Sequence, residues 1–271
     1  MRVEDGTALS VTDWPVAAPR AHVLLVHGLG EHAGRYGHVA AWLNARGFAV
    51  RAYDQAGHGA SDGPRGGMKT DTQLLDHLDT VFTATSREAE GRPVVLLGHS
   101  LGGLLVAAAV AAGRIRPQAL VLSSPALAVR MVAWQRAVVG WLPRIAPDLT
   151  LGNGLQSRYL SHDANVVEAY VDDPMVHDCI SARLGAFVAT TGDKVLLSAP
   201  RWDVPTLLLY AGDDFLVDPS GSDRFVALAP QDMVEARRFA GLYHEIFNEV
   251  DSAPVFAALD EWLNRRGCPA A

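Results

Sequence analysis

The chain has 271 residues, with 23 lysines and arginines against 30 aspartates and glutamates, so its formal net charge is −7. This length suits a single α/β core with an insertion. Because the charge balance is acidic and no basic cluster is present, a nucleic-acid partner is not expected.

Features that report on cellular location point to the cytoplasm. The first ten residues, MRVEDGTALS, lack the charged-then-apolar pattern of a secretion signal, and no uninterrupted apolar run has the length of a membrane span. The two cysteines, Cys179 and Cys268, lie far apart and follow no metal-binding spacing, as fits a reducing compartment. We therefore expect a cytoplasmic protein.

The predicted elements of the first part of the chain alternate between strands and helices. Residues 8–14 alternate loosely and suggest a strand, and residues 22–26 form a continuous apolar run of the kind that is buried in parallel sheets. Residues 35–46 carry apolar side chains at helical spacing up to Gly47, a typical helix stop. A strand over 48–53, a glycine-rich turn over 54–61 and a helix over 73–89 are predicted next.

The remaining elements continue this alternation around one interruption. A strand over 94–97, a small-residue helix up to residue 112 and a strand over 119–122 come first. A strand over 206–210, a helix over 220–229, a strand over 234–239 and a helix over 253–265 end the chain. Residues 127–203 show scattered prolines and glycines and no clear buried strand. We predict an α/β fold with a doubly wound, mostly parallel sheet formed by residues 1–126 and 204–271, and residues 127–203 as an inserted helical lid.

The motif Gly98-His99-Ser100-Leu101-Gly102 lies between a predicted strand and a predicted helix, which is the context that a G-x-S-x-G nucleophile motif needs. The turn is so tight that the residues two places on either side of the serine must lack bulky side chains. Ser100 is therefore predicted to be a nucleophile beside the N-terminus of the following helix. An ordinary glycine-rich turn is the alternative.

A nucleophilic serine needs a base, normally histidine, and a carboxylate that orients the base. Of the ten histidines, His244 is the only one after Asp214, and the order Ser, acid, His is the one found with this elbow. We predict Asp214 as the acid because it begins a D-x-x-V-x-P pattern, with Asp213 and Asp218 as competitors. Asp218 is expected to cap the next helix or to hold its loop.

Acyl transfer also needs N–H donors for the oxyanion of the tetrahedral intermediate. The N–H of Leu101, directly after the nucleophile, is predicted to be one donor, and the N–H of Leu29, in the loop after the strand over 22–26, the other. A mere tight turn would give the same glycine-bearing loop.

Three histidines near these loops have other predicted roles. His99 should point away from the nucleophile at the elbow. His27 and His58 lie in glycine-rich turns, where a structural hydrogen bond is the expected role. No histidine and carboxylate cluster has ligand spacing, so neither a metal nor a cofactor is predicted.

Several strings of the sequence resemble the monoacylglycerol lipases of the α/β-hydrolase fold. The narrowest are H-G-x-G-E-H-x-G-R-Y at 27–36 and Y-H-E-x-x-N-E at 243–249; the glycine turn at 54–61, the nucleophile motif, the Asp214 segment and the Asp5-Gly6 opening extend the resemblance over nearly the whole chain. The resemblance implies an α/β-hydrolase fold with a triad and two oxyanion donors, namely Ser100, Asp214 and His244 with Leu29 and Leu101.

The resemblance also implies that Glu31 and Arg35 shape a polar, glycerol-facing part of the site. A surface or structural ion pair is the alternative for these two residues. In the second half of the lid, Tyr170, Asp173-Pro174 and His177 are similar to the family, and Tyr170 is a candidate substrate contact.

Residues 127–142 carry apolar side chains at helical spacing, namely Met131, Trp134, Val138, Trp141 and Leu142. Such a stripe most often packs against the protein's own core. In a lid that resembles this family it would line an acyl tunnel and rest on lipid aggregates. Because the net charge is negative, contact with a membrane would be apolar and transient.

The predicted function is a cofactor-independent serine hydrolase that cleaves monoacylglycerols to fatty acid and glycerol through an acyl-enzyme intermediate. A lysophospholipase or broad carboxylesterase with the same triad is the alternative, and a low-turnover ligand receptor on a hydrolase fold is a third hypothesis. Small-molecule lipid esters are the expected partners. Fold alone does not fix the substrate.

Overall fold

The computed structural model describes residues 1–131 and 133–267, and within this range it leaves the side chains of residues 133–138 undescribed. Two parts of the sequence-based expectations lie outside the described residues: Cys268, and the side chains of Trp134 and Val138 in the predicted lid stripe.

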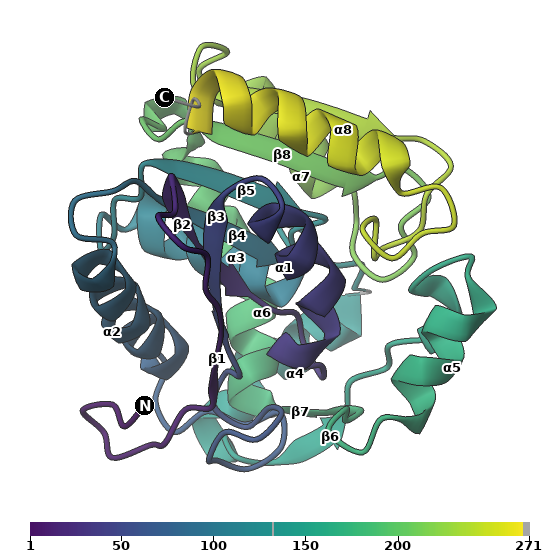
Figure 1. The fold of residues 1–271 in the computed structure, drawn as a ribbon. Helices are drawn as coiled ribbons and strands as arrows, with labels where there is room; N and C mark the ends of the chain where they lie inside the picture. The colour runs from purple at the N-terminus through teal and green to yellow at the C-terminus, as the bar shows by residue number, and fades with distance from the viewer. Residues whose placement is uncertain (132, 268–271) are drawn as a thin grey trace.

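Seven strands form one sheet in the order β1-β3-β2-β4-β5-β8-β9 (Figure 1). The strands are β1 (Val11–Trp14), β2 (Ala21–Val26), β3 (Phe48–Tyr53), β4 (Val94–His99), β5 (Ala119–Ser123), β8 (Thr206–Ala211) and β9 (Val234–Phe239). β1 pairs antiparallel with β3, and all other neighbours pair in parallel. Every residue of β4, β5 and β8 is buried, as expected of parallel strands covered on both faces.

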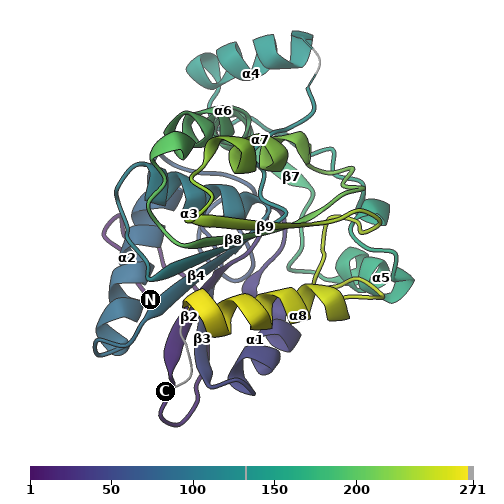
Figure 2. The same ribbon diagram turned by 90° about the horizontal axis from the view of Figure 1, so that it is seen from above.

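Helices cover both faces of the sheet, as Figure 2 shows. α1 (Gly37–Asn44) and α8 (Ala253–Trp262) lie on one face, and α2 (Gln73–Glu88), α3 (Leu101–Ala111), α6 (Ala182–Ser198) and α7 (Ser220–Leu228) lie on the other. Because side chains alternate along a strand, Val23 and Leu25 of β2 enter the first core, and Leu24 and Val26 enter the second. The sheet is therefore buried between two apolar layers.

The segment between β5 and β8 adds no strand to the seven-stranded sheet within the described residues. It contains α4 (Ala133–Ile145), a two-stranded ribbon of β6 (Thr150–Gly152) and β7 (Cys179–Ser181), α5 (Ala164–Asp172) and α6. We call residues 127–203 the lid segment; these boundaries stay a prediction. Figure 2 shows α4 as the outermost helix, above α6 and α7.

The sheet and its flanking helices confirm the predicted α/β-hydrolase architecture, with two local differences. The helix predicted over 35–46 is divided into a 3₁₀ turn (Ala33–Tyr36) and α1. The apolar spacing from residue 127 suggests a helix there, but α4 begins at Ala133. The reason is close packing: a Cβ on Gly192 of α6 would collide with the Leu127 carbonyl, and one on Gly221 of α7 would lie 2.6 Å from the Ala128 nitrogen.

The order of the strands fixes where a site can form. The chain runs from β2 outward to β3 and then places β4 on the other side of β2, so the direction of winding reverses between β2 and β4. In open α/β sheets, ligands bind at the carboxyl ends of the strands at such a reversal. The register pairs Val26 with Gly98, which brings the loop after β2 beside the turn after β4. Within residues 1–131 and 133–267, no helix is long and apolar enough to cross a bilayer.

Candidate active site

Ser100 occupies the turn between β4 and α3 with φ 52° and ψ −116°, a backbone conformation that residues other than glycine rarely adopt. The two glycines of the motif allow this turn. A Cβ on Gly98 would lie 2.6 Å from the Gly102 carbonyl oxygen, and one on Gly102 would lie 2.5 Å from the His27 carbonyl oxygen. The tight elbow predicted from the sequence is therefore present.

The first turn of α3 leaves backbone donors beside Ser100. The Ser100 carbonyl accepts the N–H of Leu104 at 2.9 Å. N–H groups that precede this first bond, including that of Leu101, have no acceptor within the helix. They and the positive end of the helix dipole favour negative charge at this position.

Asp214 and His244 form a buried pair at the carboxyl ends of β8 and β9. Asp214 Oδ2 lies 2.7 Å from His244 Nδ1, and Asp214 Oδ1 accepts the N–H groups of Leu216 and Val217 at 2.9 and 3.0 Å. The two residues are 2% and 4% exposed. This geometry fixes the tautomer that carries its proton on Nδ1 and leaves Nε2 free to accept a proton.

The charge balance within this pair favours the charged forms. Burial alone would raise the pKa of Asp214, but the facing His244 and the two backbone donors hold it below its ordinary value. Burial alone would lower the pKa of His244, but the charge and hydrogen bond of Asp214 raise it above its ordinary value. An imidazolium that forms on His244 is therefore stabilised by Asp214.

The other two acid candidates differ from Asp214. Asp213 is exposed, and its N–H donates to the Leu242 carbonyl at 3.2 Å. Asp218 accepts the N–H of Ser220 at 3.0 Å and so holds the start of α7, as predicted. Of the three aspartates, Asp214 has the bond to His244.

His99 packs against the predicted base. Its ring centroid is 4.7 Å from that of His244, and its Nδ1 lies 3.0 Å from Ser123 Oγ. Burial, followed by the neighbouring His244, lowers the pKa of His99 to about 4. Ser100 and His244 form no direct hydrogen bond in the described structure; such contacts often tighten only in the substrate complex.

The loop after β2 packs directly on the elbow. A Cβ on Gly28 would lie 2.8 Å from Glu31 Oε1 and 3.2 Å from the Ser100 Cβ, so a larger residue here would press on both side chains. The Gly28 N–H donates to Glu31 Oε1 at 2.6 Å, which fixes the loop that carries Leu29. The structure therefore brings the Leu29 and Leu101 segments to the same serine, while their role as oxyanion donors stays a prediction.

Glu31 and Arg35 form a partly buried ion pair, and a structural ion pair was the alternative considered for them. Arg35 Nη1 lies 2.6 Å from Glu31 Oε2, and the Tyr36 hydroxyl donates to Glu31 Oε1 at 2.6 Å. Burial alone would raise the pKa of Glu31. The charge of Arg35, together with smaller effects of other neighbouring groups, outweighs burial and holds the pKa of Glu31 well below its usual range. The Tyr170 ring lies over the guanidinium, 4.8 Å from ring centroid to Cζ. A contact of these three residues with substrate stays a prediction.

His27 and His58 have the structural hydrogen bonds expected of them. His27 Nδ1–H donates to the Gly28 carbonyl at 2.8 Å, and its Nε2 accepts the Gln55 N–H at 2.9 Å. His58 Nδ1–H donates to the Ala56 carbonyl at 3.1 Å. Both histidines thus hold the glycine-rich turns beside the site.

Two carboxylates beside His244 were missed as site residues by the sequence reasoning. Glu245 pairs with Arg35, its Oε1 lying 2.6 Å from Nη1. Glu249 accepts the N–H groups of Tyr243 and His162 at 2.6 and 3.0 Å, so it joins the His244 loop to the lid segment. The available signal was the Y-H-E-x-x-N-E string, which contains both glutamates but not their partners.

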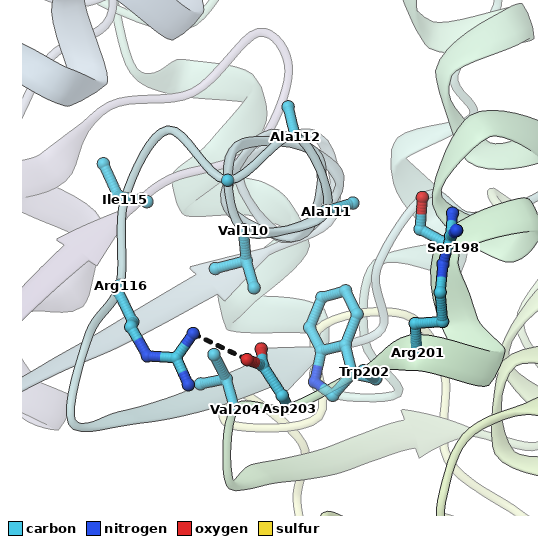
Figure 3. A pocket seen from close by; sticks show the side chains of 11 residues that line it. Val110, Ala111, Ala112, Ile115, Arg116, Ser198, Arg201, Trp202, Asp203 and Val204 are labelled. Atoms are coloured by element: carbon cyan, nitrogen blue, oxygen red, sulfur yellow. Dashed lines mark hydrogen bonds and ion pairs between the residues drawn. The ribbon is translucent and has the colours of Figure 1, made fainter.

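Two cavities lie on the α3 side of the sheet. One, of about 290 Å³, lies between α4, α6 and α7 and is lined by residues that include Leu127, Val139 and Val188. The other, of about 440 Å³, is lined by the carboxyl end of α3 and by residues around Trp202, with an ion pair between Arg116 and Asp203 (Figure 3). Because α3 has eleven residues and rises about 1.5 Å per residue, this second cavity lies at the end of the helix away from Ser100.

Within residues 1–131 and 133–267, no group of three or more His, Cys, Asp or Glu side chains has the geometry to hold a metal ion.

Comparison with known proteins agrees with this geometry. A family model described as serine aminopeptidase, S33, matches residues 17–251. The monoacylglycerol lipase of Mycolicibacterium smegmatis is 33% identical over 252 residues, which cover 92% of this chain and 90% of that protein. An uncharacterized abhydrolase domain-containing protein of Dictyostelium discoideum is 30% identical over 267 residues, which cover 97% of this chain and 28% of that protein.

Among solved structures, the monoacylglycerol lipase of Paleococcus ferrophilus has a TM-score of 0.86 and 36% sequence identity, covering 94% of this chain and 98% of that chain. The family match spans most of the sequence, and the fold and the nucleophile elbow are those of a serine hydrolase. The chain is a hydrolase that belongs to the monoacylglycerol lipase family of the α/β-hydrolase fold.

Proposed function

We propose that this hydrolase cleaves monoacylglycerols to a fatty acid and glycerol through an acyl-enzyme intermediate. The observation that carries the proposal is the buried Asp214–His244 pair at the same sheet edge as the strained Ser100 elbow. The names of two relatives that match most of the chain support the substrate class.

In the proposed reaction, Ser100 Oγ attacks the ester carbonyl while His244 Nε2 accepts its proton. The charge that develops on the carbonyl oxygen is bound by the N–H groups of Leu29 and Leu101. When the tetrahedral intermediate collapses, the ester bond breaks and His244 gives its proton to the departing glycerol oxygen. Water, activated by His244, then attacks the acyl-Ser100 ester and releases the fatty acid.

The two parts of the substrate would lie on different sides of Ser100. The polar cluster of Glu31, Arg35 and Tyr170 lies beside the oxyanion loop and suits the glycerol hydroxyls. The cavity of about 290 Å³ between α4, α6 and α7 has an apolar part, with Leu127, Val139 and Val188, and a polar part, with Asp193 and Arg224. Its apolar part would take the acyl chain. Arg130, in the loop that leads to this cavity, donates to the Asp214 carbonyl at 2.9 Å, which links the lid segment to the acid.

We also propose that α4 rests on lipid aggregates when the enzyme takes up substrate. Trp141 and Ile145, four residues apart on this helix, are 68% and 76% exposed. Large apolar side chains on one side of an outer helix favour insertion into a lipid interface. Binding of Trp141→Ser to phosphatidylcholine vesicles should be weaker than binding of the wild type, and equal binding would contradict this part of the proposal.

Steady-state hydrolysis of a series of monoacylglycerols tests the proposed substrate. Matching diacylglycerols, lysophosphatidylcholines and an aminoacyl p-nitroanilide are measured in parallel, with Ser100→Ala as the blank. A higher kcat/KM for monoacylglycerols that is absent in the blank would support the proposal. Higher kcat/KM for lysophosphatidylcholine would favour the lysophospholipase alternative, and turnover of short activated esters alone would remove the lipid assignment.

A further inference from the structure

Glu245 directly follows His244 and has no part in the proposed reaction, yet its carboxylate is buried and bonded on both oxygens. Oε1 and Oε2 accept hydrogen bonds from Arg35 Nη1 and Nη2 at 2.6 and 2.8 Å. Oε2 also accepts one from Asn248 Nδ2 at 2.8 Å. The planar guanidinium and the carboxylate thus meet through two parallel bonds, a geometry that restricts their relative orientation strongly.

The same arginine also holds the loop that follows β2. Arg35 Nη1 also donates to Glu31 Oε2 at 2.6 Å, and Glu31 Oε1 accepts the Gly28 N–H at 2.6 Å. A continuous series of charge-assisted hydrogen bonds therefore runs from the backbone next to Leu29 to the residue next to His244. Arg35 and Glu245 are 210 positions apart in the sequence, so this series joins two loops that the chain does not connect locally.

Stability alone is a poor explanation for this cluster. Two buried carboxylates meet one partly buried guanidinium: Glu31 and Glu245 are only 3% and 5% exposed, and the Arg35 side chain is 11% exposed. The cost of removing buried ion pairs from water commonly cancels their attraction. Apolar side chains of similar volume would therefore stabilise the fold equally well. What the ion pairs supply instead is a fixed distance and orientation between the two loops.

We propose that Glu245, acting through Arg35 and Glu31, is a positioning residue that holds the His244 loop and the Gly28-Leu29 loop in the relative geometry that acyl transfer requires. The proposal rests on the proposed roles of His244 as base and Leu29 as oxyanion donor. The substrate carbonyl must meet the nucleophile, the base and the oxyanion donors at once, and a misplacement of about 1 Å can lower the rate ~100-fold.

The test compares Glu245→Gln with Asp260→Asn, using kcat and KM for a monoacylglycerol and for p-nitrophenyl butyrate. Asp260→Asn is the control because it also removes a carboxylate that pairs with an arginine distant in sequence: Asp260 Oδ1 lies 2.6 Å from Arg46 Nε. Asp260 lies near the C-terminal end of α8, away from the site loops. We expect Glu245→Gln to lower kcat about tenfold or more on both esters, with KM changed less than about twofold, and Asp260→Asn to change neither.

A double-mutant cycle with Glu31→Gln tests the route through Arg35. Both carboxylates act through one guanidinium, so their effects should not be independent. The kcat of the double variant should be about threefold or more higher than the value expected from multiplying the two single losses. Strictly multiplicative losses, or an unchanged kcat in Glu245→Gln, would overturn the proposal. If Glu31→Gln does not fold, Tyr36→Phe, which removes one hydrogen bond to Glu31 on the other side of Arg35, replaces it in the cycle with the same criterion.

The two esters separate this proposal from the proposed function. An increase in KM for the monoacylglycerol with p-nitrophenyl butyrate unaffected would assign Glu245 to glycerol binding and overturn the positioning role. If the wild type hydrolyses p-nitrophenyl butyrate but not monoacylglycerols, the substrate assignment fails; a tenfold lower kcat of Glu245→Gln on the aryl ester would still support the positioning role.

Discussion

Replacing Asp214 by asparagine changes one atom of the buried pair and reverses the hydrogen bond to the predicted base. The two backbone N–H groups of Leu216 and Val217 require an oxygen at the Oδ1 position. The amide of Asp214→Asn therefore directs its NH₂ group at His244 Nδ1, because the flipped orientation would place that group against two other donors. His244 must then accept at Nδ1 and carry its proton on Nε2, where it cannot take the proton of Ser100.

The size of the loss follows from what the tautomer controls. Without general-base assistance and without the facing carboxylate that stabilises the imidazolium, kcat is expected to fall by about 10⁴, or about 5 kcal/mol of barrier. Binding of the ester does not involve Asp214 directly, so KM should change little. The fold should persist because the replacement keeps the shape of the side chain and the bonds to Oδ1.

The matched control is Asp213→Asn, which changes the same chemical group one position earlier. Because Asp213 is exposed, its kcat should stay within about twofold of the wild type. Both variants are measured with p-nitrophenyl butyrate and by the rate of fluorophosphonate labelling at Ser100. Equal losses in the two variants, or a loss of less than tenfold in Asp214→Asn, would refute the acid assignment and the tautomer argument with it.

Three further predictions concern the elbow and the base. Ser100→Ala and Ser100→Gly should both lack turnover, but the glycine variant should melt a few degrees higher because φ 52° strains any other residue by about 1–3 kcal/mol; equal melting temperatures would contradict the strain. Gly102→Ala should prevent or strongly destabilise folding through collision with the His27 carbonyl, whereas Gly241→Ala, with no atom within 4 Å of the new Cβ, should melt like the wild type. Because only neutral His244 can act as base and its pKa is raised, the acidic limb of a kcat/KM profile should lie above about pH 6.5; a limb below that pH would contradict the assignment.

The sheet and the elbow could be predicted because their signals are local. A continuous apolar run such as β2 or β4 reports burial on both faces, and the spacing of Gly98 and Gly102 around Ser100 reports a turn in which a Cβ would collide. The pairing of Asp214 with His244 followed from chain order, since parallel strands bring their carboxyl ends to one edge. These inferences need no knowledge of contacts between distant segments.

The features that the sequence did not predict depend on contacts between distant segments. The sequence places Glu245 and Glu249 in one short string but does not show that the first binds Arg35 and the second binds the backbone of His162. The start of α4 was mispredicted for a related reason, since apolar spacing continues through Leu127 although that backbone is packed against glycines on two other helices. Close packing of one backbone against another leaves no periodic pattern in the sequence of either segment.

Contacts of the lid segment with the core also indicate where substrate enters. Its second half is bound at three separate places: His162 to Glu249, the His177 N–H to the Gly30 carbonyl at 2.9 Å, and Asp173 to His32 at 2.8 Å. Opening the whole segment as one body would break all three contacts at once. α4 is the outermost helix and already exposes apolar side chains to its surroundings. We therefore expect substrate to enter at α4, while the half of the segment that supports the His244 loop stays in place during turnover.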